Sequence, residues 1–262
     1  MLLRRSRWAT NLPPMASPLT HDAEADISLW QDISPPSSQR LLLAALESFA
    51  ELGFHGTTTR DIARRAKMSP AALYVHYPSK GALLFEISRA AHQAMLQEWR
   101  AAFAQEAGSA AERLANLIRA QVRFHATHHT AARVANYELH SLSATQANQI
   151  RALRTEMGRV MREAVRLGVN SGDFTVSDLG ATCVAIISLG VDTSRWFDPR
   201  GRLTPDEIGD LYAELGLRLV GHESGRTSDG DLAGIRMAKS NHPSRSAHPK
   251  RRSRRGRTVP SP

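Results

Sequence analysis

The sequence predicts an all-α protein, with three helices near the N-terminus followed by about six more. Apolar residues recur at helical spacing through most of residues 37–221, and the alternation typical of strands is essentially absent. Several of these periodic segments begin with Ser, Thr or Pro in the positions that favour a helix start. A length of 262 residues with 42% hydrophobic residues is enough for one or two domains with a proper core.

The first helix is expected at residues 37–52. Ser37 or Ser38 is its candidate cap, and Gly53 is its expected end, because glycine is favoured where a helix terminates. Its apolar stripe consists of Leu42, Leu46 and Phe49. Residues 1–36 are rich in Pro, Ser and Thr and show no period, so we predict that they are disordered.

Two short helices follow, each with its own start signal. Thr58 can cap the first of them, with Asp61 as the acidic partner of a capping box. Ser69 can cap the second, and Pro70 takes the first helical position, where a missing N–H costs nothing. Only the two residues 67–68 separate the helices. This layout is typical of a helix-turn-helix, whose second helix enters the DNA major groove.

The outward side of this helix pair carries residue types suited to DNA. Small side chains at the start of the second helix allow close approach to the bases and contact with thymine methyl groups. Hydroxyl, ring and cationic groups nearby are suited to phosphate oxygens. The candidate DNA-contacting residues are Thr58, Thr59, Arg60, Lys67, Ser69, Pro70, Ala71, Ala72, Tyr74, His76, Tyr77 and Lys80. The alternative is a compact helical corner in which the two tyrosines only pack, and Tyr77 could serve in both ways.

Six further helices are expected after the helix-turn-helix. Ser79 is the candidate cap of the first, a long helix with an apolar side. Gly168 and Gly172 mark a break, and Thr204 with Glu207 gives another capping-box signal. The apolar stripes of the later helices lie at residues 114–122, 131–142, 150–167, 177–197 and 204–221.

Residues 37–92 resemble the N-terminal domain of the TetR family of transcriptional repressors. The matching stretches are residues 49–54, 56–58, 61–63, 68–69, 73–74, 76–77 and 79–80. Lys67 departs from the pattern, since the family usually has glycine in this turn. The resemblance implies an all-helical homodimer that binds a palindromic double-stranded DNA operator through its three N-terminal helices. The remaining helices would then form a domain for dimerisation and for binding a small-molecule effector, and no cofactor is expected.

The charge is distributed unevenly along the chain. The formal net charge is +9, and we divide the chain into an N-terminal extension (1–36), a DNA-binding domain (37–92), an effector and dimerisation domain (93–221) and a basic tail (222–262). The DNA-binding domain is basic, the effector domain is neutral, and the tail holds ten Lys and Arg against three acidic residues. A basic balance suits nucleic acid as a partner. We expect the tail to be disordered, and it either adds salt-sensitive DNA affinity or is an idle extension.

The effector is expected to be small and apolar, and an acyl-CoA thioester is one hypothesis. Residues 196–201 and 133–139 are similar to TetR members that sense acyl-CoA thioesters. Such a ligand needs an apolar tunnel for its acyl chain, and cations with an aromatic face for its nucleotide. The candidate effector-binding residues are Phe124, Tyr137, Met157, Met161, Arg195, Trp196 and Arg200. A different apolar effector is the alternative, as is a purely structural role for the methionine and aromatic stripes.

The last two helices, 177–197 and 204–221, are expected to form the dimer interface as a four-helix bundle with their symmetry mates. Gly180, Ala181, Gly190 and Gly216 would allow the close contact between them.

Other chemistry finds little support in the sequence. His125, His128 and His129 could share a helix face and bind a metal, but no acidic partner accompanies them, so we expect no metal site. No Ser-His-Asp elbow, phosphate loop or dinucleotide fingerprint appears, which argues against an enzyme. The single cysteine, Cys183, excludes a disulfide within the chain and suits a reducing, cytoplasmic setting. No apolar run is long enough to span a membrane.

Overall fold

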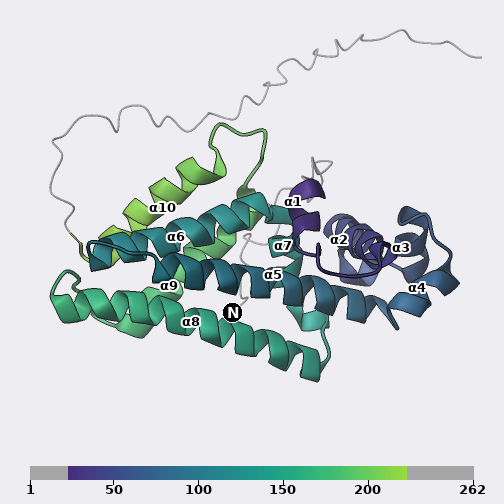
Figure 1. Ribbon diagram of the computed structural model, residues 1–262, viewed down its shortest axis with the longest axis horizontal. Helices are drawn as coiled ribbons and strands as arrows, with labels where there is room; N and C mark the ends of the chain where they lie inside the picture. Colours follow the sequence, from purple (N-terminus) through teal and green to yellow (C-terminus); the bar gives the residue numbers. More distant parts are fainter. Residues whose placement is uncertain (1–22, 223–262) are drawn as a thin grey trace, which may run out of the picture. The chain divides into compact units, whose positions relative to one another are not determined.

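The computed structural model describes residues 23–222, and this part of the chain is entirely helical, as the sequence predicts (Figure 1). The helices are α1 (Ala23–Ser28), α2 (Pro36–Gly56), α3 (Thr59–Arg65), α4 (Pro70–His76), α5 (Lys80–Ala104), α6 (Ala110–Thr127), α7 (His129–Tyr137), α8 (Ala144–Ser171), α9 (Leu179–Trp196) and α10 (Pro205–Leu219), with a 3-10 turn at Leu139–Ser141. The predicted disordered tail and most of the predicted N-terminal extension lie outside the described residues.

The extension is ordered where the structure describes it, which corrects part of the prediction of disorder for residues 1–36. Residues 23–36 contain α1 and a turn that places Trp30 in the core, with 1% of its surface exposed. Leu29, next to it, packs against both hydrophobic cores of the protein. A six-residue helix is too short to show a period, so the sequence pattern gives no signal for it.

The first predicted helix forms as α2, but its start differs from the prediction. Pro35 takes the cap position without a side-chain bond, and Ser37 and Ser38 lie inside the first turn. Their hydroxyl oxygens lie 3.0 Å and 3.2 Å from the two ring nitrogens of His76 on α4. The predicted end at Gly53 is confirmed in its essentials, because Gly53 has φ of 70° and breaks the helical path before one last turn.

The start signals of the helix-turn-helix are confirmed. The N–H of Asp61 donates to the Thr58 hydroxyl at 3.2 Å, and Oδ2 of Asp61 accepts from the N–H of Thr58 at 3.1 Å. The Ser69 hydroxyl accepts from the N–H of Ala72 at 3.1 Å, with Pro at the first helical position of α4. Lys67 has φ of 56°, so the turn does require a left-handed residue.

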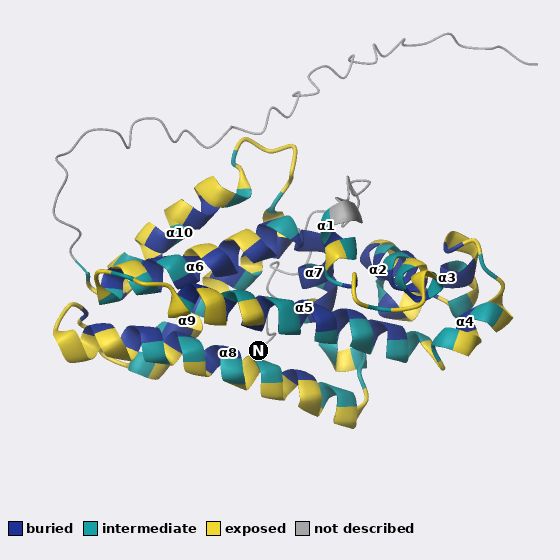
Figure 2. Cartoon of the chain, viewed as in Figure 1, coloured by how far each residue is buried: buried dark blue, intermediate teal, exposed yellow. Residues whose placement is uncertain are grey.

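The described residues form two hydrophobic cores, and buried residues face the contacts between helices (Figure 2). The N-terminal core is built from α2 to α5 and includes Leu46, Ile62, Leu73 and Ile87. Helix α7 also contributes Val134 to it, so a helix of the C-terminal part packs directly on the N-terminal helices.

Helix α6 is the centre of the second core, and α10 packs closely along it. Gly209 and Gly216 of α10 face α6: an added Cβ would lie 3.5 Å from the Arg119 backbone and 2.3 Å from Ile118 Cδ1, respectively. Gly190 of α9 likewise faces Gln121. We expected Gly190 and Gly216 to allow close helix contact in the dimer interface; they do allow close contact, but with α6 of the same chain.

Helix boundaries elsewhere differ from the prediction by a few residues. The expected helix at 131–142 is α7 followed by the 3-10 turn. Gly168 lies within α8 rather than in a break, because its missing side chain makes room for the ring of Phe174. Gly172 ends α8 with φ of 81°, and the Thr204–Glu207 capping box starts α10, both as predicted.

Candidate nucleic-acid interface

The outward side of α3 and α4 presents most of the candidate DNA-contacting residues on one surface. Thr58 and Arg60, at the start of α3, are exposed, as is Tyr74 on α4 with 53% of its surface. The hydroxyls of Thr59 and Tyr74 lie 3.2 Å apart, which joins the start of α3 to the outer side of α4. Lys67, Ser69, Pro70 and Ala71 are exposed, and Ala72 is intermediate.

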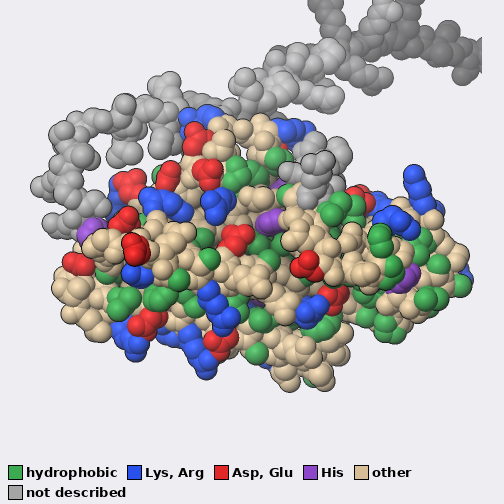
Figure 3. Space-filling view, in the orientation of Figure 1, with side chains coloured by type: hydrophobic (Ala, Val, Ile, Leu, Met, Phe, Trp, Pro, Cys, Tyr) green, Lys and Arg blue, Asp and Glu red, His purple; other side chains and the backbone are tan. Residues whose placement is uncertain are grey.

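This surface carries positive charge that the protein does not neutralise. Arg60 and Lys67 form no ion pair with the described residues. By contrast, Arg64 pairs with Asp61 at 2.8 Å, and Arg65 pairs with Glu51, whose hydrogen bond raises the pKa of the guanidinium. In the space-filling view, Lys and Arg side chains project from the region around α3 (Figure 3).

Three of the candidates are turned inward. Both ring nitrogens of His76 face serine hydroxyls of α2, as described above. Tyr77 packs its ring against the N-terminal core, and its burial, with the nearby Glu86 carboxylate, raises the pKa of its hydroxyl to about 12. The ammonium of Lys80 donates to the carbonyl oxygens of Phe54 and Thr57. The structure thus separates these three from the outward-facing set.

Val75 of α4 was missed by the sequence analysis. It has 81% of its surface exposed, more than either neighbour on the helix. The sequence did contain a signal for it: Val75 is apolar and β-branched, yet the helical pattern does not place it in the core. Such a side chain suits contact with a thymine methyl group.

The candidate effector-binding residues do not meet in one tunnel. Met157 and Met161 are buried in the second core, and Trp196 stacks on Tyr212 at the surface, with ring centroids 6.3 Å apart. Arg195 lies over the ring of Tyr137 at 5.8 Å.

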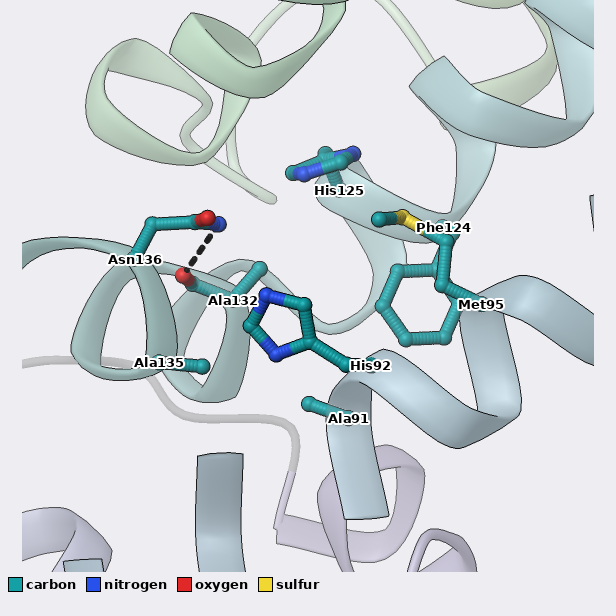
Figure 4. A pocket seen from close by; sticks show the side chains of 8 residues that line it. All are labelled: Ala91, His92, Met95, Phe124, His125, Ala132, Ala135 and Asn136. Atoms are coloured by element: carbon teal, nitrogen blue, oxygen red, sulfur yellow. Dashed lines mark hydrogen bonds between the residues drawn. The ribbon is translucent and has the colours of Figure 1, made fainter. Parts of the chain in front are cut away.

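Phe124 lines a small cavity of about 10 Å³ between α5, α6 and α7 (Figure 4). His92 and His125 also line it, and each directs Nδ1 at a carbonyl oxygen of its own helix, 2.7 Å and 2.8 Å away. Their burial lowers both pKa values to about 4. A space of this size holds about one water molecule.

A larger cavity of about 270 Å³ lies where the α6–α7 junction meets the loop between α9 and α10. Its lining residues are Ala126, Thr127, His129, Phe197, Pro199, Gly201, Leu203, Thr204 and Pro205. Arg200 belongs to the same loop, and its N–H groups donate to Asp198, which lowers the pKa of that carboxyl. Of the predicted effector-binding residues, Arg200 therefore lies within the loop that borders the cavity.

The predicted histidine group does not form a ligand cluster. Nδ1 of His125 faces the Gln121 carbonyl oxygen, Nδ1 of His129 faces that of Ala126, and His128 lies beside Asp26. Within residues 23–222, no three potential ligands are placed to share a metal ion. No helix of this part of the chain is long and apolar enough to cross a membrane.

Comparison with known proteins identifies the family. The family model for bacterial regulatory proteins of the tetR family matches residues 41–87, and that for a tetracyclin repressor-like C-terminal domain matches residues 107–220. The HTH-type transcriptional repressor KstR2 of Rhodococcus jostii (strain RHA1) is 29% identical over 190 residues, which cover 70% of this chain and 92% of the relative.

Two solved structures extend the comparison. A bacterial regulatory protein in the tetR family from Rhodococcus RHA1 is 38% identical, with a TM-score of 0.68 over 71% of this chain and 98% of that one. The ketosteroid transcriptional regulator KstR2 of Mycobacterium tuberculosis is 26% identical, with a TM-score of 0.65 over 71% and 95%.

Within residues 23–222, an all-helical fold with an exposed, basic helix-turn-helix and a helical C-terminal part defines a DNA-binding regulator of transcription. The two family matches together cover most of the described residues. The chain belongs to the TetR family of transcriptional regulators, as the resemblance of residues 37–92 indicates.

Proposed function

We propose that this protein is a homodimeric repressor that binds a palindromic operator through α3 and α4 and leaves it when a small, largely apolar effector binds. The proposal of DNA binding rests on one observation. The first turn of α3 and the exposed side of α4 form one outward surface, where the hydroxyls of Thr59 and Tyr74 meet. Arg60 and Lys67 supply phosphate contacts. Pro70, Ala71, Ala72 and Val75 approach the base edges, where thymine methyl groups are available to apolar side chains.

The dimer interface is the outer side of α9 and α10. These helices expose large apolar side chains that the described chain does not cover, namely Val184, Leu189, Trp196, Leu211, Leu215 and Leu219. Pairing with a second copy buries them in a four-helix bundle. The two copies of α4 then enter successive major grooves, about 34–36 Å apart, which matches a palindromic site.

The effector site is the cavity beside the α9–α10 loop. Its volume of about 270 Å³ is close to the lower end, about 300 Å³, of ligand pockets. Phe197 and Leu203 give it an apolar wall, while Arg200 and Arg202 of the same loop offer cations outside it. A coenzyme A thioester fits this division, with its acyl group inside and its phosphates at the arginines. The relative named as a ketosteroid regulator supports a bulky apolar acyl group.

Release follows from linkage between the two sites. An effector shifts the protein towards the DNA-free state only by binding that state more tightly. Helix α5 runs from the end of α4 into the second core, so a change around α6 and α7 reaches the recognition helix through it.

The operator is tested by sequencing the genomic DNA that the purified protein retains and by footprinting it. We expect protection of an inverted repeat and loss of binding in Tyr74→Ala. Protection without symmetry, or equal binding to all sequences, would contradict the proposal.

The effector is tested by titrating the operator complex with coenzyme A thioesters, with the matching free acids as controls. We expect release by thioesters of bulky acyl groups and no release in Leu203→Trp, whose indole fills the cavity. Operator binding without effector serves as the check that Leu203→Trp remains folded. Release of wild type and variant at the same concentrations would place the effector elsewhere.

A further inference from the structure

Lys80 directs its charge into the protein rather than towards solvent. It is the first residue of α5, and its ammonium donates to the Phe54 carbonyl at 2.7 Å and to the Thr57 carbonyl at 2.8 Å. The same ammonium lies 4.4 Å from the centroid of the Phe54 ring. Carbonyl groups at the end of a helix lack partners within it and favour a positive charge. Lys80 therefore closes the C-terminal end of α2.

Glu138 also contacts the backbone of Phe54. It follows α7, and its Oε1 accepts a hydrogen bond from the Phe54 N–H at 3.3 Å. The chain bends here, because Gly53 has φ of 70°, and the position of a Cβ on Gly53 would lie 3.6 Å from this carboxylate oxygen. The backbone of Phe54 is thus fixed by side chains from α5 and from the C-terminal part of the chain.

These two contacts define where the helix-turn-helix lies. Thr57 directly precedes Thr58, the cap of α3, and Lys80 follows the short segment that leaves α4. One ammonium therefore connects the end of α2 to both ends of the helix-turn-helix. A swing of Lys80 out to a phosphate would remove the donor from two carbonyl groups and release this connection.

We propose that Lys80 and Glu138 are positioning residues for DNA binding: they fix α3 and α4 through the backbone of Phe54, and Lys80 makes no phosphate contact. This inference rests on the proposed operator-binding function. Each copy of the dimer must hold α4 in the orientation that binds DNA. The fraction of chains in that orientation therefore multiplies the apparent operator affinity once for each copy. If that fraction falls to about one third in each, operator affinity falls about tenfold.

The test compares Lys80→Met and Glu138→Ala with two controls. Arg60→Gln removes a proposed phosphate contact, and Glu138→Gln keeps an acceptor oxygen for the Phe54 N–H. The probe is the duplex that the wild-type protein retains from genomic DNA, titrated between about 0.05 and 0.2 M salt. We expect Lys80→Met and Glu138→Ala to weaken binding about tenfold with an unchanged salt dependence, and Glu138→Gln to resemble wild type. Arg60→Gln should lower the slope of log affinity against log salt by about 2 per dimer.

Amide hydrogen exchange of residues 71–77 in the free protein provides a readout that needs no DNA. We expect faster exchange in Lys80→Met and Glu138→Ala and no change in Arg60→Gln. A reduced salt slope in Lys80→Met would make Lys80 a phosphate contact and overturn the inference, as would unchanged exchange in both variants. If the wild-type protein retains no specific DNA, the operator-binding function fails, whereas the exchange result still decides whether the two residues fix α4.

Discussion

Asp26 of α1 places Oδ1 3.5 Å from Nδ1 of His128, the residue between α6 and α7. Asp26 is buried, with 2% of its surface exposed, and Trp30 a few residues later fills the N-terminal core. The first segment that the structure describes thus contacts both the helices that carry the DNA-binding surface and those that surround the proposed effector cavity. It is part of the folded protein rather than an appendage.

We expect Asp26→Ala to lower the free energy of unfolding by about 1–3 kcal/mol, because it removes one partner of a buried polar contact. Asp32→Ala is the matched control, since Asp32 belongs to the same segment but is exposed. Urea unfolding followed by circular dichroism measures both. Equal midpoints for the two variants would show that the contact of Asp26 with His128 contributes nothing.

The short-range features of the fold were predictable from the sequence, and the reasons are local. A capping box involves two residues three positions apart, so Thr58 with Asp61 and Thr204 with Glu207 were identifiable without the fold. The left-handed turn at Lys67 has no such local marker, because lysine stands where the family usually has glycine.

The features that the sequence analysis missed depend on contacts between distant segments. His76 and Lys80 have residue types that suit phosphate, yet they face α2, which no spacing within α4 reveals. Gly190 and Gly216 have no side chains to mark a direction, so their neighbour could only be identified from the packed helices. Met157 was assigned to a ligand tunnel because an apolar stripe looks the same whether it lines a tunnel or a core.

Stability should fall on acidification because of His92 and His125. Burial depresses both folded-state pKa values to about 4, below the value of about 6.5 in the unfolded chain. Between these two values the unfolded state binds more protons, so the free energy of unfolding decreases as the pH falls from about 6.5 towards about 4. Each ring should account for roughly 2 kcal/mol between pH 7 and pH 5.

Urea unfolding at pH 7 and pH 5 measures this dependence. His92→Gln should reduce the difference between the two pH values by about half, because one of the two buried rings is gone. His222→Gln is the control, since His222 is only partly buried. A difference of the same size in His92→Gln and wild type would show that His92 is not held neutral.

Lys67 combines backbone strain with a functional charge. Its φ of 56° costs a residue with a Cβ about 1–2 kcal/mol. Lys67→Gly should therefore raise the free energy of unfolding by about 0.5–1 kcal/mol after the larger entropy of the unfolded glycine is subtracted. Lys67→Ala removes the charge but keeps the Cβ, so it should show no such gain.

Lys67→Gly and Lys67→Ala should both weaken operator binding. Both should also lower the slope of log affinity against log salt by about 2 per dimer, because the lost phosphate contact occurs once in each copy. Calorimetry and salt-dependent binding assays separate the two effects. Stabilisation of Lys67→Ala as large as that of Lys67→Gly would contradict the assignment of strain to the backbone.

Gly190 should not tolerate a side chain. A Cβ at this position would lie 2.4 Å from Nε2 of Gln121, which is buried and donates to the Ile187 carbonyl at 2.7 Å. Gly190→Ala must displace that amide, and we expect a loss of about 1–3 kcal/mol. Gly180→Ala, on an exposed part of the same helix, should change the stability much less. Thermal unfolding of both variants makes the comparison, and similar melting temperatures would contradict the close packing of α9 on α6.

The outer side of α10 should decide whether the protein dimerises. Leu215 has 38% of its surface exposed in one copy of the chain, and burying that remaining surface contributes about 0.5–1 kcal/mol in each copy. Leu215→Asp places a charge in the proposed four-helix bundle twice, because the interface repeats each contact by symmetry. We expect sedimentation to report a monomer, and operator affinity to fall towards that of a single helix-turn-helix.

Leu167 on α8 is a similarly exposed leucine, so Leu167→Asp is the matched control and should leave the dimer intact. If Leu167→Asp dissociates the dimer and Leu215→Asp does not, the interface lies on α8 rather than on α9 and α10, and the two copies of α4 would need a different arrangement to reach successive grooves.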